Sequence, residues 1–134
     1  MSTFFDSNIL IYAYSTDVRR ERAATKIADG GVISVQVLNE FTNVLRKKLK
    51  QDWLVIEAAL QSLRLRFPDV LPLTADTHAA ALGLARDHGL AFYDALIVAS
   101  AIDAGCDTLY SEDLQHNRAI EGLTIRNPFL EGRQ

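Results

Sequence analysis

Residues 93–114 read YDALIVASAIDAGCDTLYSEDL, and this stretch decides the expected fold. From Tyr93 to Ala104 it is apolar nearly all round, which is typical of a helix buried in a core. Gly105 ends that helix, and the apolar run from Thr108 to Tyr110 predicts a short buried strand. Three polar residues, Ser111 to Asp113, follow at the carboxyl end of the strand. A buried helix that leads directly into a buried strand predicts an α/β fold.

The rest of the chain alternates short strands and helices in the same way. Apolar runs predict further strands at Thr3 to Phe5, Val32 to Ile33, Val70 to Leu73 and Leu123 to Ile125. Helical spacing predicts helices at Asn8 to Tyr14, Val18 to Asp29, Val35 to Leu49, Trp53 to Arg66 and Asp76 to His88. We therefore expect a three-layer α/β/α fold with a central, mainly parallel sheet, in one domain that spans residues 1–134.

Four acidic residues stand at or near the ends of these predicted elements. Asp6 follows the first strand, Asp94 lies in the first turn of the buried helix, Asp113 follows the strand at 108–110, and Glu40 lies at the edge of an apolar helix face. Ligands of open parallel sheets bind outside the carboxyl ends of the strands, where residues distant in sequence meet. Two carboxylates ~4 Å apart repel by roughly 4 kcal/mol at the dielectric of a protein surface, so such a group needs protons or a cation. The sequence predicts a divalent-metal site.

Each aspartate also has a simpler structural explanation when it is taken singly. Asp6 could cap a helix, Asp94 could be stabilised by the dipole of its helix, and Asp113 could stabilise a turn. Glu40 is the hardest to explain in this way, because it lies beside the apolar face of its helix. Four such coincidences at one edge of a sheet are improbable, and the metal site is the favoured interpretation.

The composition indicates a soluble, cytoplasmic protein without membrane association. The net charge of −3 argues against tight non-specific binding to nucleic acid, which depends on neutralised phosphates. No apolar run approaches the ~20 residues of a membrane span, and the N-terminus lacks the features of a signal peptide. The single cysteine, Cys106, lies in an apolar setting and is predicted to be a buried structural thiol.

Basic residues are nevertheless grouped along the chain. The groups are Arg19, Arg20 and Arg22; Arg46, Lys47, Lys48 and Lys50; and Arg64 with Arg66. Solvated helix faces are the simpler interpretation of these groups. Basic flanks around an acidic site would also suit a phosphate polymer.

The motifs around the acidic residues resemble those of a PIN-domain nuclease, and most closely those of VapC-type toxin ribonucleases. They are Asp6-Ser7-Asn8, Glu40 in a helix, Tyr93-Asp94-Ala95-Leu96, and Ser111-Glu112-Asp113-Leu114, and together they cover nearly the whole chain in order. The resemblance implies an endoribonuclease that depends on Mg²⁺ or Mn²⁺ and acts on RNA. It also implies a homodimer and the toxin of a type II toxin–antitoxin pair, with a cognate antitoxin that blocks the active site.

The resemblance also implies roles for particular residues. Asp6, Glu40, Asp94 and Asp113 match the acidic quartet of the family, which is both catalytic and metal-binding, and Asn8, Ser111 and Glu112 stand at supporting positions. Either Glu112 or Asp113 could face the site, and the family pattern favours Asp113. We hypothesise that Asp6 and Asp94 bind the metal directly, and that Glu40 and Asp113 complete its shell or hold a second ion.

Other classes of protein account less well for the sequence. Receiver domains and haloacid-dehalogenase-like phosphatases use a late lysine, whereas no lysine follows Lys50. A non-cutting PIN-like module that binds RNA or a partner protein is the main alternative. Tyr93 could stack on a base, although packing is the favoured interpretation. Apolar residues could form a dimer face or an antitoxin groove if the core does not claim them; they are Phe4, Ile11, Tyr12, Tyr14 and Trp53.

Overall fold

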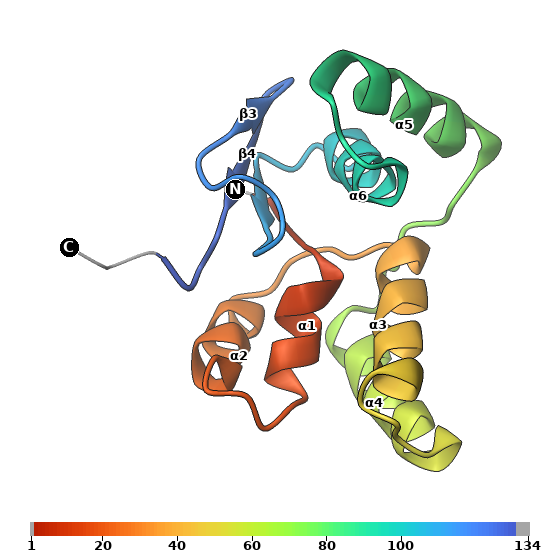
Figure 1. Ribbon diagram of the computed structural model, residues 1–134, viewed down its shortest axis with the longest axis vertical. Coiled ribbons are helices and arrows are strands. Elements are labelled where there is room, and N and C mark those ends of the chain that lie inside the picture. Colours follow the sequence, from red (N-terminus) through yellow and green to blue (C-terminus); the bar gives the residue numbers. More distant parts are fainter. Residues whose placement is uncertain (1, 131–134) are drawn as a thin grey trace.

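A mixed four-stranded sheet organises the computed structural model, which describes residues 2–130 (Figure 1). The strands are β1 (Thr3–Phe5), β2 (Thr108–Tyr110), β3 (Ala119–Ile120) and β4 (Leu123–Arg126), in the spatial order β1-β2-β4-β3. β1, β2 and β4 run parallel, and only β3 pairs antiparallel with its neighbour β4. The predicted α/β fold with a mainly parallel sheet is confirmed.

Six helices flank this sheet in the described part of the chain. They are α1 (Ser7–Ala13), α2 (Arg20–Ala28), α3 (Val35–Lys47), α4 (Trp53–Arg66), α5 (Ala75–His88) and α6 (Phe92–Asp103). In Figure 1, α5 and α6 pack together at the upper right, while α1 to α4 lie below them. The predicted helices are all present, with ends that differ by a few residues. None of the helices in residues 2–130 is long and apolar enough to cross a membrane.

Local chemistry explains where several helices begin and end. Ser34 caps α3, where its side chain accepts a hydrogen bond from the Val37 N–H. α5 ends at Gly89, whose positive φ of 67° is readily available to glycine. α2 begins at Arg20, later than predicted, because the Asp17 carboxylate binds both the backbone and the guanidinium of Arg19 in the preceding turn.

Two predicted strands are wrong in their extent. Val32 and Leu71 take part only in isolated parallel bridges, to Phe4 and Ser34 respectively. The first segment is confined between Gly31 and the cap of α3, and the second contains Pro72, which lacks the N–H needed to extend a ladder. The backbone still hydrogen-bonds there, with the Leu71 N–H donating to the Ile33 carbonyl at 3.0 Å.

β3 is a strand that sequence analysis missed. It pairs with β4 through a two-residue turn of Glu121 and Gly122, whose φ angles are 49° and 88°. Positive φ at both central residues is the mark of the hairpin turn that suits the twist of antiparallel strands. Glutamate is an unusual residue for such a turn, so the sequence signal for this hairpin is weak.

The core lies between the sheet and the helices and includes most of α6. Ala95 to Ala101 are buried, as the all-round apolar pattern predicts, and Cys106 is buried as well. Phe4 is 0% exposed, so the core claims it and it is not available for a dimer face or an antitoxin groove. Trp53 is 54% exposed, so it lies outside the core. The core thus fixes α6 and β2 against β1, and this positions the strand ends that carry acidic residues.

Candidate active site

Asp6 occupies the junction between β1 and α1. Its backbone N–H donates to the Tyr110 carbonyl at 2.9 Å, which joins the end of β1 to the end of β2. Its side chain caps α1, with Oδ1 accepting from the Ser7 N–H at 2.7 Å. The residue is only 3% exposed. The predicted helix-capping role is therefore real, but it accounts for one carboxylate oxygen and leaves the other to face the neighbouring loop.

Two polar side chains connect Asp6 to the loop after β2. The Ser111 hydroxyl donates to Asp6 Oδ2 at 2.7 Å and accepts from the Asp113 N–H at 3.2 Å. Asn8 Nδ2 lies 3.0 Å from Asp113 Oδ2 and 3.4 Å from Asp6 Oδ2, so one amide lies between both carboxylates. Asn8 Oδ1 accepts from the Glu112 N–H. These bonds hold the loop against the first turn of α1.

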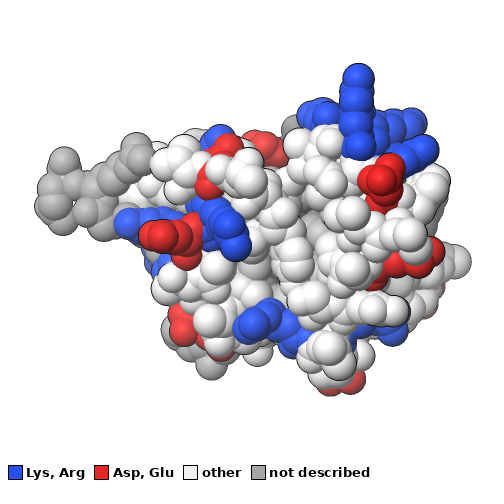
Figure 2. All heavy atoms as spheres, turned by 90° about the horizontal axis from the view of Figure 1, so that it is seen from below, with Lys and Arg blue, Asp and Glu red and all other residues white. Residues whose placement is uncertain are grey.

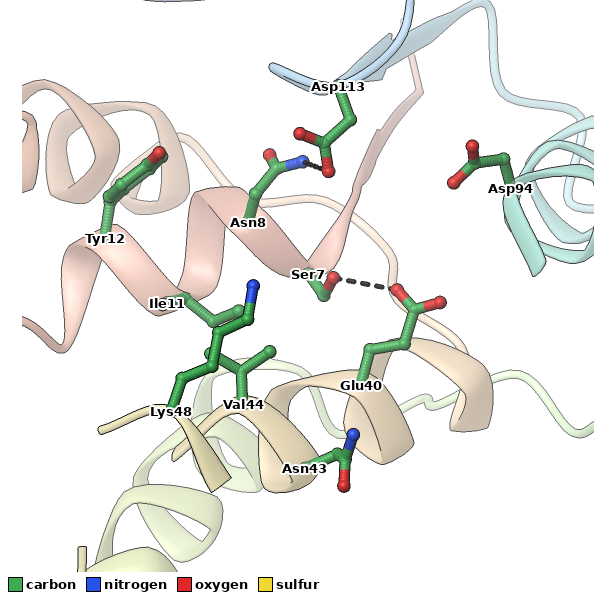
Figure 3. A pocket seen from close by; sticks show the side chains of 10 residues that line it. All are labelled: Ser7, Asn8, Ile11, Tyr12, Glu40, Asn43, Val44, Lys48, Asp94 and Asp113. Carbon is green, nitrogen blue, oxygen red and sulfur yellow. Dashed lines mark hydrogen bonds between the residues drawn. The ribbon is translucent and has the colours of Figure 1, made fainter. Parts of the chain in front are cut away.

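Glu40 projects from α3 toward the same place (Figure 3). Its Oε1 accepts from the Ser7 hydroxyl at 2.8 Å, and its Oε2 accepts from Gln36 Nε2 at 3.2 Å. Gln36 lies one helical turn before Glu40, which is the spacing at which side chains on one helix face meet. Both oxygens of Glu40 are therefore oriented by donors from α1 and α3.

Asp94 approaches from the opposite side, in the first turn of α6 (Figure 3). Its side chain makes no hydrogen bond or ion pair with any residue in the range 2–130. Burial raises the pKa of its carboxyl group, and the charges of Glu40 and Asp113 raise it further. This half-buried carboxylate lies near other carboxylates, and the field of the helix N-terminus favours its charge.

The acidic side chains share one open cavity of about 400 Å³. Glu40, Asp94 and Asp113 line it together with Asn8 and Lys48, while Asp6 is buried next to it and is hydrogen-bonded to Asn8. Figure 3 shows the Lys48 amine on the side of the cavity away from Asp94. Residues from α1, α3, α6 and the loop after β2 thus meet at one place, beside the carboxyl ends of β1 and β2, as predicted for the edge of a parallel sheet.

The electrostatics of the cavity favour a bound cation. Burial raises the pKa of Asp6 from 3.8 to about 7. The hydrogen bond from Ser111 lowers this pKa, whereas the charges of Glu40 and Asp94 raise it further. All the acidic ligands offer oxygen, which suits the hard ions Mg²⁺ and Mn²⁺. Within residues 2–130, no three His, Cys, Asp or Glu side chains are already grouped closely enough to hold a metal ion. Mg²⁺ keeps several waters and needs few direct carboxylates, so the oxygen donors of this cavity would suit it.

The pH dependence of stability should reflect the raised pKa of Asp6. The Asp6 carboxyl group has a pKa of 3.8 in the unfolded chain and about 7 in the folded protein, so the folded protein binds its proton more tightly. The contribution of this proton to the stability of the fold is complete below pH 3.8 and is lost as the pH rises through about 7. A divalent cation binds the ionised carboxylate and should offset the loss. We expect Mg²⁺ or Mn²⁺ to raise the melting temperature more at roughly pH 8 than at roughly pH 5. The same scans on Asp6→Asn should lose this difference, and an equal rise at both pH values in the unchanged protein would contradict the assignment.

Glu112 and Asp113 point to different surroundings. Asp113 lines the cavity, whereas Glu112 accepts from the Tyr12 hydroxyl at 2.5 Å and pairs with Arg19 at 2.9 Å. The Arg19 guanidinium also lies 4.1 Å from the centre of the Tyr12 ring. Glu112 is thus engaged in a network that anchors the loop to α1 and to the segment before α2. This geometry favours Asp113 as the fourth acidic residue of the site.

Paired substitutions should separate the two residues. We expect Asp113→Asn to reduce the rate of RNA cleavage by at least about tenfold, since ligand or supporting positions of metal sites typically contribute this much. Glu112→Gln keeps a hydrogen-bond acceptor for Tyr12 and should reduce the rate much less. Rates measured with saturating metal test this expectation. A larger loss for Glu112→Gln than for Asp113→Asn would reverse the assignment.

Sequence analysis gave no individual role in this site to four side chains that contribute to it: Ser7, Gln36, Asn43, and Lys48, which it named only within a basic group. Ser7 is part of the quoted Asp-Ser-Asn motif, but nothing in that motif indicates a partner on another helix. The other three lie 4, 3 and 8 residues from Glu40, along α3 and its C-terminal cap. Helical spacing from Glu40 could have found these three.

Comparison with known proteins identifies the family. The sequence profile of the PIN domain matches residues 3–121, so this chain belongs to the PIN-domain family. Comparison with curated protein sequences gives no significant match.

The similar solved structures include proteins of toxin–antitoxin systems. VapC20 from Mycobacterium tuberculosis, a toxin that cleaves the sarcin–ricin loop, is 24% identical, with a TM-score of 0.69 over 84% of this chain and 90% of that one. A toxin–antitoxin complex from Klebsiella pneumoniae is 23% identical, with a TM-score of 0.72 over 95% of this chain and 98% of that one. VapBC2 from Rickettsia felis, bound to a DNA fragment from their promoter, is 20% identical, with a TM-score of 0.69 over 95% and 98%. At these identities the likeness establishes a common fold.

Proposed function

We propose that this chain is a divalent-metal-dependent endoribonuclease and the toxin of a type II toxin–antitoxin pair. The observation that carries the proposal is the meeting of Glu40, Asp94 and Asp113 in one cavity above Asp6, on a PIN-domain scaffold. The likeness to VapC20, which cleaves an RNA loop, supports RNA as the substrate. The net charge of −3 makes a defined RNA target more suitable than indiscriminate binding.

In this proposal the four carboxylates have different roles. Asp6 and Asp94 would hold Mg²⁺ or Mn²⁺ directly, and Glu40 and Asp113 would complete its shell or hold a second ion. When bound, such an ion would supply positive charge to stabilise the phosphoryl oxygens and would activate water for attack on the phosphodiester bond. Asn8 and Ser111 keep Asp6 and Asp113 oriented through hydrogen bonds to these carboxylates and their loop. Lys48 lies where it can pair with a phosphate at the cavity rim.

The surface charge agrees with this limited mode of RNA binding. Figure 2 shows one face on which lysine and arginine gather at one corner but otherwise alternate with acidic and uncharged surface. A continuous basic band, which would bind any nucleic acid through its phosphates, is not seen on that face. We infer that recognition depends more on the neighbourhood of the acidic cavity than on the charge of the whole molecule.

The expected partners extend the proposal. Two of the similar structures are of toxin–antitoxin pairs, which supports a cognate antitoxin for this chain. A homodimer and a cytoplasmic location are also proposed. A mass measurement over a range of concentrations tests the dimer. A non-cutting module that only binds RNA or a partner is the alternative, and the four carboxylates argue against it because mere binding has no need of them.

Cleavage of a mixed pool of labelled single-stranded and structured RNAs tests the proposed function. We expect defined fragments in Mg²⁺ or Mn²⁺ and none with a chelator. Intact RNA under all metal conditions would contradict the ribonuclease assignment. A melting temperature that rises with metal in the absence of any cleavage would favour the non-cutting alternative.

A further inference from the structure

A second hollow adjoins the carboxylate cavity and has a different character. It has a volume of about 390 Å³ and is lined by Gln36, Asn39, Glu40, Asn43 and Tyr93. Glu40 and Asn43 line both hollows, so the two are neighbours along α3. The proposed chemistry needs the first hollow only. The second offers amides and an aromatic ring beside the place where a phosphodiester would be cut.

The amides of this hollow come from one face of α3. Gln36, Asn39 and Asn43 are spaced by three and four residues, which places their side chains along one stripe of the helix. Gln36 is buried and donates to Glu40, so it is committed to the carboxylate. Asn39 and Asn43 are exposed, and neither makes a side-chain hydrogen bond within the described residues. Each therefore presents a free amide donor and a free acceptor to whatever enters the hollow.

Tyr93 forms the other wall and is 65% exposed, so the predicted packing of its side chain is wrong. Its described ring contact is a tilted one with Phe92, at 6.1 Å between centroids. Its hydroxyl makes no hydrogen bond in residues 2–130. Tyr93 immediately precedes Asp94 in the first turn of α6 and lines the hollow together with Glu40, so its ring lies near the carboxylates. An exposed ring beside free amides is the combination that proteins use to stack on an unpaired base and contact its edge.

We propose that this hollow binds the unpaired base of a nucleotide next to the scissile phosphate. The Tyr93 ring stacks on the face of the base, and Asn39 and Asn43 hydrogen-bond to its edge. Lys48 lies on the other side of the carboxylate cavity and would meet the phosphate backbone there (Figure 3). The RNA would thus pass from Lys48, across the carboxylates, to Tyr93. The proposal rests on the proposed function and narrows its substrate to single-stranded RNA or an unpaired loop, because a paired base cannot enter.

Removal of the ring tests the stacking. We expect Tyr93→Ala to raise KM for single-stranded RNA by about 5- to 150-fold with little change in kcat, since stacking of a base on an aromatic side chain contributes binding. Tyr93→Phe retains the ring and should retain most of the affinity. Since Tyr93 is exposed, the melting temperature should change little in either variant. A merely structural role would move the melting temperature and would not give this split between KM and kcat.

Replacement of Asn39 and Asn43 by alanine tests whether their amides recognise the edge of the base. The fragment ends produced from a pool of random single-stranded RNA give the base preference on each side of the cut. We expect Asn39→Ala and Asn43→Ala to flatten this preference at one flanking position. Gln61→Ala removes an exposed amide from α4, away from the hollow, and serves as the matched control that should leave the preference unchanged.

The outcomes separate this proposal from the proposed function. Suppose that the unchanged protein cuts RNA, and that Tyr93→Ala and the two asparagine variants cut it with the same KM and the same base preference. In that case the proposed binding of a base in the hollow is wrong, and the ribonuclease assignment stands. If the unchanged protein cuts no RNA with either metal, both are overturned. A raised KM for Tyr93→Ala together with an altered preference for the asparagine variants supports the hollow.

Discussion

Replacement of Asp94 by asparagine is expected to lower kcat for RNA cleavage by at least about 10²-fold, because it removes a carboxylate proposed to hold the metal ion, and with that ion the positive charge that would stabilise the phosphoryl oxygens. The fold should survive, since the Asp94 side chain makes no hydrogen bond or ion pair within residues 2–130. The melting temperature without metal should stay the same or rise, because a neutral amide at this position would not be repelled by Glu40 and Asp113, whose charges raise the pKa of Asp94. Cleavage assays and thermal melts with and without Mn²⁺ measure both effects.

A matched variant on the same helix controls this experiment. Asp103 is the exposed last residue of α6, so Asp103→Asn makes the same chemical change at the opposite end of the helix. It should leave cleavage unchanged. Full activity of Asp94→Asn in Mg²⁺ would remove Asp94 from the proposed metal site. A large fall in its melting temperature would show instead that Asp94 has a structural role.

The second large effect concerns stability. Phe5→Ala should lower the free energy of unfolding by about 3–5 kcal/mol, the usual cost of emptying a buried phenylalanine site. Phe5 is 0% exposed, and its ring lies 5.8 Å from both the Phe67 and the Tyr110 rings, measured between centroids. Chemical denaturation with a fixed m-value gives the free energy directly.

The loss of the Phe5 ring should also disturb the candidate active site. Asp6 is the next residue, and its position depends on the pairing of β1 with β2. Because small domains are stable by only about 5–15 kcal/mol, we expect this variant to be partly unfolded at elevated temperature. Leu65→Ala is the comparison, since Leu65 is 85% exposed and its loss should change the free energy by less than about 0.5 kcal/mol. Similar losses for the two variants would contradict the described core.

Much of the fold could be predicted because the sequence repeats clear physical signals. α6 is apolar all round and is buried, and α3 begins at Val35, where helical spacing predicts its start. The errors occurred where tertiary context decides. Val32 and Leu71 belong to segments too short to show whether they form a ladder or a single bridge. The turn at Glu121 lacks the residues that usually indicate a hairpin.

That the four acidic residues lie near one another could be predicted, but the contacts that connect them could not. Parallel pairing of β1 with β2 brings Asp6 and Asp113 to one edge, and this follows from the alternation of elements. Periodicity indicates which face of a helix is apolar, but it does not show which polar residue meets another element. The bond between Ser7 and Glu40, and the exposure of Tyr93, depend on how α1, α3 and α6 are packed. Those relations exist only in three dimensions.

The pairing of β1 with β2 has a consequence for the moment at which the proposed activity can begin. Asp6 is held by the Tyr110 carbonyl and by Ser111, more than 100 residues later in the chain. A growing polypeptide therefore cannot assemble this centre until the ribosome has released almost the entire domain, since long-range pairing must wait for its partner strand. An enzyme that destroys RNA would thus remain harmless to the message from which it is being translated until synthesis is nearly complete.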